Sequence, residues 1–132
     1  MTPPLVIIDA ANVVGSVPDG WWRDRAGATE RLRDSLTNLA TDGLPAGPGV
    51  PDWLREPPLD VVLVVEGAAR KVGGTDQVRV VSARGSGDDA IVDLVRAEGA
   101  DRQTVVITAD RGLRDRVTAL GASVLGPRTV RR

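Results

Sequence analysis

The sequence contains neither cysteine nor histidine. The lack of cysteine excludes disulfide scaffolds, zinc knuckles, iron–sulfur sites and thiol nucleophiles. The lack of histidine removes the Ser-His-Asp triad, the usual general base and every imidazole metal site. Any chemistry must therefore rely on carboxylates, amides, hydroxyls and arginines, together with a hard metal ion if one is bound.

Tyrosine and phenylalanine are also absent, and three tryptophans are the only aromatic residues among 132. The core must therefore be built from valine, leucine, isoleucine and alanine. The 17 basic and 18 acidic residues nearly cancel, so the overall charge does not point to nucleic acid or to a membrane surface. No apolar run is long enough to span a bilayer, and residues 1–4 lack the basic region of a signal peptide. We therefore expect a cytoplasmic protein with no membrane partner.

Short apolar runs alternate with segments of helical periodicity along the chain. Strands are expected at residues 5–8, 61–65, 78–81, 105–107 and 122–125, and helices at residues 22–41, 87–99 and 113–120. This alternation predicts a three-layer α/β sandwich with a mainly parallel five-stranded sheet, folded as one domain over residues 1–132. Prolines at positions 45, 48, 51, 57 and 58 make residues 44–58 a predicted surface loop without helix or strand. Trp53 and Leu54 are the residues expected to fasten this loop to the core.

Acidic residues follow four of the predicted elements. Asp9 and Glu66 directly follow the first two strands, Asp110 lies just after the fourth, and Asp88 and Asp89 open the helix after the third. Because the carboxyl ends of parallel strands meet at one edge of the sheet, all five carboxylates are expected there. Close carboxylates raise one another's pKa unless a cation holds them, and with oxygen ligands that cation would be Mg²⁺ or Mn²⁺.

Each acid also has a purely structural interpretation. Asp110 is placed to cap a helix, and Ser86 with Asp89 resembles a capping box. Acids in a first helical turn also complement the helix macrodipole, and Glu66 could belong to a solvated turn. Asp9, at the end of a central strand, is not expected to cap a helix. The placement of the whole set at one edge favours the functional interpretation.

Other phosphate-binding motifs are absent or unsuitable. Residues 85–90 read Gly-Ser-Gly-Asp-Asp-Ala and match the dinucleotide fingerprint formally. The two acids, however, occupy the helix N-terminus where the pyrophosphate would lie, and the motif follows the third strand rather than the first. The P-loop motif is missing. Ala11 stands where haloacid-dehalogenase-type phosphatases need a second aspartate.

Four short motifs occur in order between residue 5 and about residue 127: Asp9-Ala-Ala-Asn12, Val65-Glu66, Ser86-Gly-Asp88-Asp89 and Thr108-Ala-Asp110-Arg111. Together they resemble the NYN branch of the PIN-like nucleases, close to the YacP-like bacterial group. The sequence departs from many relatives at Ala10-Ala11, where they have Gly-Tyr, and at Glu66, where aspartate is commoner.

The resemblance implies a Rossmann-like, PIN-like sheet of strand order 3-2-1-4-5 and a metal-dependent ribonuclease that hydrolyses RNA phosphodiester bonds. It implies metal-binding roles for Asp9, Asp88 and Asp110, with Asn12 in support and Asp89 assisting at the Mg²⁺ or Mn²⁺ site. The role of Glu66 stays open, although its place at the sheet edge makes it a further candidate ligand. RNA is the expected partner, with DNA and a homodimer left open.

Arginines near these segments are candidates for holding the strand. They are Arg23, Arg25, Arg84, Arg111 and Arg114, and solvated helix faces would explain them equally well. Trp21 and Trp22 could stack on bases or fasten their loop to the next helix, and we expect Trp22 to be partly buried.

Two further functions use the same acids. The chain could be a non-catalytic nucleic-acid-binding or interaction module of the same fold, or a small nucleotide or phosphate hydrolase. Cleavage of labelled RNA in the presence of Mn²⁺ separates a nuclease from a binding module. Turnover of mononucleotides separates the hydrolase from both.

Overall fold

Five parallel strands form the centre of the computed structural model, which describes residues 2–131. The strands lie in the order β3-β2-β1-β4-β5, so the chain starts in the middle of the sheet and crosses from one half to the other after β3. This arrangement confirms the PIN-like, Rossmann-like sheet expected from the sequence. The strands are β1 (Leu5–Asp9), β2 (Asp60–Val65), β3 (Val78–Ser82), β4 (Thr104–Ile107) and β5 (Ser123–Leu125).

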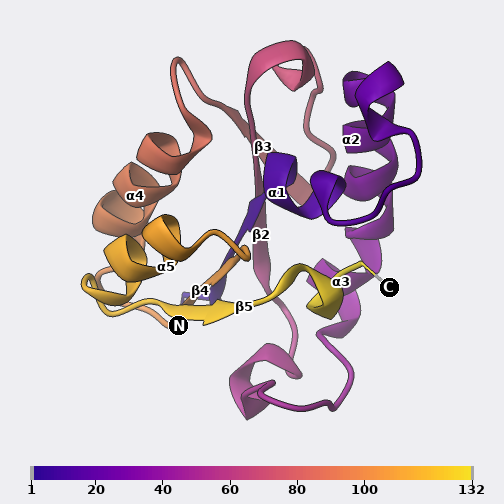
Figure 1. Cartoon of the computed structure of the whole chain (residues 1–132). Helices are drawn as coiled ribbons and strands as arrows, with labels where there is room; N and C mark the ends of the chain where they lie inside the picture. Colours follow the sequence, from indigo (N-terminus) through magenta and orange to yellow (C-terminus); the bar gives the residue numbers. More distant parts are fainter. Residues whose placement is uncertain (1, 132) are drawn as a thin grey trace.

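Helices cover both faces of the sheet, as Figure 1 shows. One face carries α1 (Ala10–Gly15), α2 (Arg25–Ser35) and α3 (Thr37–Asp42). The other carries α4 (Gly87–Glu98) and α5 (Arg111–Thr118). Four 3₁₀ turns complete the described structure: Trp21–Arg23, Asp52–Leu54, Gly67–Ala69 and Pro127–Thr129. Among residues 2–131, no helix combines the length and apolar character needed to cross a bilayer.

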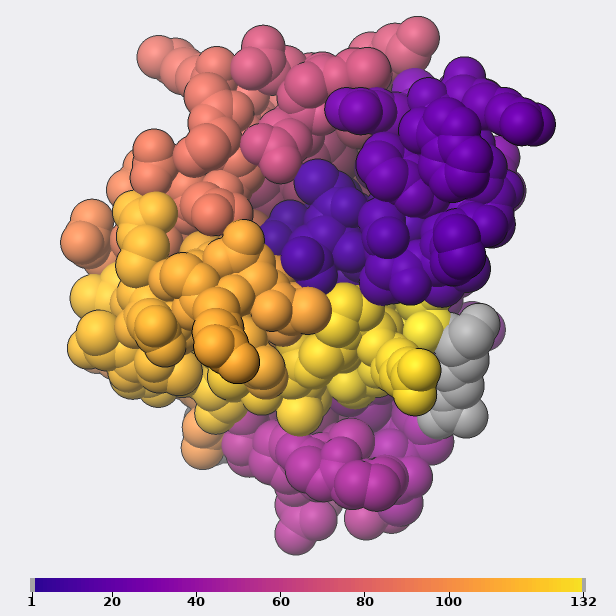
Figure 2. Space-filling model, in the orientation of Figure 1, coloured from indigo at the N-terminus to yellow at the C-terminus, as the bar shows by residue number. Residues whose placement is uncertain are grey.

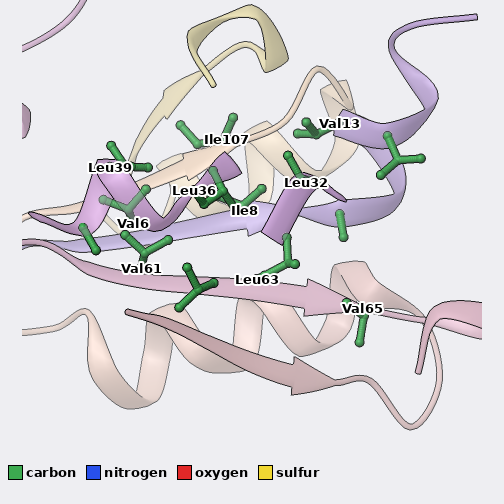
Figure 3. Packing of buried hydrophobic residues seen from close by; sticks show 14 of the residues in the cluster. Val6, Ile8, Val13, Leu32, Leu36, Leu39, Val61, Leu63, Val65 and Ile107 are labelled. Carbon is green, nitrogen blue, oxygen red and sulfur yellow. The ribbon is translucent and has the colours of Figure 1, made fainter. Parts of the chain in front are cut away.

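Two hydrophobic cores lie on opposite faces of the sheet, because successive side chains of a strand point to opposite sides. Val6 and Ile8 belong to the core beneath α1–α3, and Leu5 and Ile7 belong to the core beneath α4 and α5. Figure 3 shows the first core, where Leu36 lies among the strand side chains. The three central strands, β1, β2 and β4, are buried on both faces, which explains their almost uninterrupted apolar sequences, whereas the edge strands β3 and β5 are partly exposed.

The first 40 residues contain more helical elements than the sequence indicated. A short helix, α1, begins directly after β1, where the sequence pattern predicted no helix. The single helix predicted over residues 22–41 is divided into a 3₁₀ turn, α2 and α3. Asp24 starts α2 by accepting a hydrogen bond from the Gly27 N–H at 2.9 Å, and α2 ends at Leu36, whose side chain is fully packed in the core.

The proline-rich loop lies at the opposite end of the sheet from the strands' carboxyl ends (Figure 1). It contains one 3₁₀ turn, so the expectation of no helical structure was wrong by three residues. Leu54 is fully buried and Trp53 packs against the core, which confirms them as the anchors. Gly43 allows the chain to pass close by, since a Cβ there would lie 2.6 Å from the Arg55 carbonyl oxygen.

Candidate metal site at the carboxyl edge of the sheet

Strand geometry directs the two strand-end acids toward α4 and α5. Asp9 follows Leu5 and Ile7 on the same side of β1, and Glu66 continues the side of β2 that carries Val62 and Val64. The helices on this face, α4 and α5, both begin at this edge, because each follows the carboxyl end of a strand. Their N-termini bring positive partial charge to the edge where the carboxylates gather.

Asp9 is the most buried acid of the site, with 5% of its surface exposed. Thr108 Oγ1 donates a hydrogen bond to Asp9 Oδ2 at 2.9 Å, and the Asn12 N–H approaches Asp9 Oδ1 at 3.4 Å. Burial raises the pKa of Asp9 to about 6, against the opposing effect of these two hydrogen bonds. The negative charges of Asp88 and Glu66 raise this pKa further.

The expectation that Asp9 caps no helix was wrong. Its side chain caps α1 through the Asn12 N–H, because α1 starts at the next residue. The Asn12 side chain contacts the loop that follows β4, where its Oδ1 accepts a hydrogen bond from the Ala109 N–H at 2.8 Å. Asn12 therefore fixes the turn between β4 and Asp110.

Asp110 has the capping role that its position predicted. Its Oδ1 accepts a hydrogen bond from the Leu113 N–H at 2.9 Å, and its own N–H donates to Thr108 Oγ1 at 3.1 Å. The cap uses one of the two carboxylate oxygens, so a second oxygen stays available for another partner. Capping and metal binding are therefore compatible at Asp110.

Glu66 joins the end of β2 to the start of α4. Its Oε2 accepts a hydrogen bond from the Gly87 N–H at 2.7 Å. The carboxylate packs closely against the start of α4, since a Cβ at position 87 would lie 3.2 Å from Glu66 Cδ. Glu66 is thus a fixed part of this edge and not a free solvated turn.

The two acids of the first turn of α4 have different surroundings. Asp89 is exposed and forms an ion pair with Arg116, Oδ1 to Nη2, at 3.0 Å. Asp88 is half-buried, and no group within residues 2–131 donates a hydrogen bond to its carboxylate. The pKa of Asp88 is raised, first by burial and then by the negative charges of Asp110 and Glu66. Ser86 caps α4 by accepting from the Asp89 N–H, so only half of the expected capping box forms.

The acids at the opposite edge of the sheet are paired with arginines, unlike Asp9 and Asp88. There Glu98 and Asp60 are both paired with Arg79, at 2.7 and 3.2 Å, and with Arg102, at 3.4 and 3.1 Å. The hydrogen bond and charge of Arg79 lower the pKa of Glu98. At the carboxyl edge the pKa values of Asp9 and Asp88 move upward instead. Arg116 pairs with Asp89 and partly offsets the rise at Asp88, but within residues 2–131 no arginine forms an ion pair with Asp9, Glu66, Asp88 or Asp110.

The structure brings Asp9, Glu66, Asp88 and Asp110 into one electrostatic group. Asp88 and Glu66 raise the pKa of Asp9, and Asp110 and Glu66 raise the pKa of Asp88. Within residues 2–131, however, no three acidic side chains adopt an arrangement that could already enclose a metal ion. The Oδ1 atom of Asp89 is paired with Arg116.

The candidate nucleic-acid-binding arginines are distributed unevenly. Arg84 and Arg111 are exposed and lie next to the starts of α4 and α5, at the edge that carries the acids. Arg23 is exposed in the 3₁₀ turn before α2. Arg114 is half-buried, and its Nε is shielded from solvent without a hydrogen-bond partner in the described part of the chain. Arg114 is therefore less accessible to a nucleic acid than the sequence suggested.

Trp21, and not Trp22, is the tryptophan of this pair that turns toward the core. Trp22 is 53% exposed, so the prediction that it is partly buried was wrong. Trp21 packs against the core beneath α1–α3 instead, and Trp22 lies edge-on to it at a ring distance of 5.9 Å. Only the three-dimensional path of the loop after α1 decides which ring turns inward.

Two site residues were missed at the sequence level. Thr108 holds Asp9 and Asp110, and its position two residues after Val106 on the α4–α5 side of β4 was a usable signal. Arg116 pairs with Asp89 across the two helices. That contact depends on how α4 and α5 pack, so no sequence pattern indicates it.

No protein-family model and no curated protein sequence matches this chain. Solved structures do match it. The chain superposes on a crystal structure of Rae1 (YacP) from Bacillus subtilis with a TM-score of 0.69 and 19% identity, over 98% of this chain and 71% of that chain. A crystal structure of a mutant of that protein gives a TM-score of 0.63 and 17% identity, over 95% and 70%. These likenesses show a YacP-like fold.

Proposed function

We propose that the chain is a metal-dependent ribonuclease that hydrolyses RNA phosphodiester bonds at the carboxyl edge of its sheet. The observation that carries the proposal is the environment of Asp9. It is a nearly buried carboxylate with a pKa raised to about 6, and further carboxylates surround it in place of cations. Such an arrangement is costly in the folded protein and is retained where a site needs concentrated negative charge.

The chemistry of the donor set fits a hard divalent cation. All the candidate ligands are carboxylate oxygens, which Mg²⁺ and Mn²⁺ prefer. Asp9, Asp88 and Asp110 would hold the metal, and Glu66 is a further candidate ligand at the same edge. A bound divalent ion would supply an activated water and neutralise charge on the phosphoryl oxygens.

The chain's own residues have separable tasks in this proposal. Thr108 and Asn12 are positioning residues, because they orient Asp9 and the turn before Asp110. Glu66 fixes the start of α4, which carries Asp88. Arg84 and Arg111, exposed at the same edge, are the arginines best placed to contact phosphates of the strand.

RNA is proposed as the substrate because two independent observations agree. The four ordered motifs resemble nucleases of the NYN and PIN-like type, and the fold resembles that of YacP.

The near-zero net charge means that binding depends on a local arginine patch, so affinity should be modest and sensitive to salt. Arg84→Gln and Arg111→Gln should each reduce the salt slope of RNA binding by about one.

Cleavage of end-labelled single-stranded RNA by the purified protein tests the proposal. Wild type should cleave with Mn²⁺ and not with chelator, and Asp9→Asn should lose on the order of 100-fold or more of this rate. Asp101→Asn, an exposed acid between α4 and β4 at the far edge, is the matched control and should cleave like wild type. Equal rates for wild type and Asp9→Asn would contradict the proposal.

Two further substrates define the specificity. A DNA strand of the same sequence should be cleaved more slowly than the RNA. Nucleoside monophosphates should not be turned over at all. Mononucleotide turnover without strand cleavage would instead identify a small nucleotide hydrolase that uses the same acids.

A further inference from the structure

A cavity of ≈ 410 Å³ adjoins the acid site on the side of α1 and α2. Its walls come from α1, the 3₁₀ turn before α2, the first turns of α2, and residues 66–70 after β2. Glu66 lines this cavity and also belongs to the acid site, so this one residue borders both. Figure 2 shows the surface set back where the indigo, pink and orange segments meet. The volume lies within the range of pockets that bind small ligands.

Trp21 and Arg25 form one wall of this cavity. The Arg25 guanidinium carbon lies 5.3 Å from the centroid of the Trp21 ring, within range of a cation–π contact. Trp21 also packs against the core and meets Trp22 edge-to-face, with an interplanar angle of 86°. The indole is therefore fixed in place with the Arg25 guanidinium over its ring, and bases stack on guanidinium planes as well as on aromatic rings.

Arg70 forms the facing wall. Its Nη2 donates a hydrogen bond to the Arg84 carbonyl oxygen at 3.0 Å, which holds the guanidinium between the loop after β2 and the turn before α4. Within residues 2–131, neither Arg25 nor Arg70 has a carboxylate at ion-pairing distance. Two uncompensated positive charges therefore border a cavity that also contains an aromatic ring, although the acid site next to it is strongly negative.

We infer that this cavity binds one nucleotide of the substrate strand, with its base against the Trp21–Arg25 pair and its phosphate held by Arg70. The inference rests on the proposed function, because the neighbouring acid site would then receive the next phosphate of the same strand. An aromatic platform matches the π-face that every base presents, and guanidinium groups match phosphate geometry. The arrangement carries no base-specific donor set, so binding should tolerate different base sequences.

Binding of a short fluorescein-labelled single-stranded RNA, measured by anisotropy in chelator, tests the inference without any cleavage. Trp21→Leu should weaken binding roughly tenfold, the usual scale for loss of one base–aromatic stack. Trp53→Leu is the matched control, because Trp53 packs against the core from the proline-rich loop and does not line the cavity; it should bind like wild type. Equal affinities for wild type and a Trp21→Leu protein with a wild-type melting curve would overturn the inference.

A second pair of variants keeps the test independent of the packing of Trp21. Arg70→Gln should weaken binding and reduce the salt slope by about one. Arg96→Gln removes the same charge from the exposed face of α4, outside the cavity, and should leave the slope unchanged. Equal slopes for Arg70→Gln and wild type would also overturn the inference.

The two proposals fail in different experiments. Mn²⁺-dependent cleavage that requires Asp9, combined with unchanged RNA binding in the Trp21 and Arg70 variants, would remove the cavity site and leave the ribonuclease. Binding that depends on Trp21 and Arg70, without cleavage under any condition, would keep the nucleotide site and remove the ribonuclease. Competition by adenosine monophosphate distinguishes a free nucleotide from a strand. A strand site predicts that the monophosphate competes far more weakly than the RNA, and equal competition would contradict it.

Discussion

The hydroxyl of Thr108 donates a hydrogen bond to Asp9 across two neighbouring strands, at 2.9 Å from Oγ1 to Oδ2. The same hydroxyl accepts the Asp110 N–H at 3.1 Å. One buried side chain thus sets the position of two carboxylates that lie about a hundred residues apart in sequence. This link makes Asp9 and Asp110 parts of one site and not two separate helix caps.

Thr108→Val should destabilise the protein by about 2–3 kcal/mol, because it leaves the buried Asp9 without its best donor and the Asp110 N–H without an acceptor. Valine has nearly the same shape, so packing should contribute little. Thr108→Ser keeps the hydroxyl and should retain most of the stability. Urea unfolding of the three proteins measures the difference, and a valine variant as stable as wild type would show that the hydroxyl is dispensable.

The pKa of Asp9 predicts how stability depends on pH. The folded protein keeps a proton on Asp9 up to about pH 6, whereas an unfolded aspartate releases it near 3.8. The folded state therefore binds more protons between these values, and the free energy of unfolding contributed by Asp9 falls as pH rises through this window. The shift corresponds to up to about 3 kcal/mol, lost by pH 7.

Asp9→Asn isolates this contribution, because all other titrating groups are shared with wild type. In chelator, wild type should lose stability relative to Asp9→Asn between about pH 4 and pH 6.5. Above that range Asp9→Asn should be the more stable protein. Urea unfolding across this pH range measures both curves, and parallel curves would mean that Asp9 has an ordinary pKa in the folded protein.

Substitutions of Asp110 separate its cap from its charge. Asn accepts the Leu113 N–H as aspartate does, so Asp110→Asn should keep the stability of α5. Asp110→Ala should lose about 1 kcal/mol. RNA cleavage should be lost in both variants, because both lack the carboxylate. Normal cleavage by Asp110→Asn would reduce Asp110 to a helix cap.

The sheet and its order follow from local patterns in this sequence. Apolar runs such as residues 61–65 are too continuous for an edge strand, and their alternation with helical segments leaves few arrangements for a parallel sheet. The acids at the strand ends could be located for the same reason, since topology alone brings carboxyl ends together. The capping roles of Asp110 and Ser86 also depend only on nearby residues.

Features that depend on tertiary contacts could not be predicted in this way. Helix α1 has only six residues and is stabilised by packing against α2, so it shows no periodicity of its own. The break at Leu36 and the inward turn of Trp21 reflect the shape of the core, which no local pattern encodes. The pairing of Asp89 with Arg116 requires two helices to meet.

Neutralising Asp88 should raise the melting temperature of the metal-free protein and reduce the stabilisation that a metal ion provides. In chelator, Asp88→Asn should melt above wild type, because the charges of Asp110 and Glu66 disfavour the Asp88 carboxylate. With Mn²⁺ at a hundredfold excess over its Kd, wild type should gain about 2.7 kcal/mol, a rise of several degrees in Tm. Asp88→Asn should gain clearly less.

Asp93→Asn is the matched control for this comparison, because Asp93 is exposed further along the same helix. Its response to Mn²⁺ should equal that of wild type. If Asp88 served only the helix macrodipole, Asp88→Asn would melt slightly below wild type in chelator and respond to Mn²⁺ normally. Thermal melts of the three proteins in chelator and in millimolar Mn²⁺ distinguish these outcomes.

Anomalous diffraction from crystals grown with MnCl₂ tests the central claim most directly, because it locates the cation without assuming a substrate. The account predicts a manganese peak bounded by the carboxylates of Asp9 and Asp88 in wild type, and no peak there in Asp9→Asn crystals grown under the same conditions. Manganese bound only elsewhere on the molecule, or an unchanged peak in Asp9→Asn, would contradict the proposal that these carboxylates form a metal site.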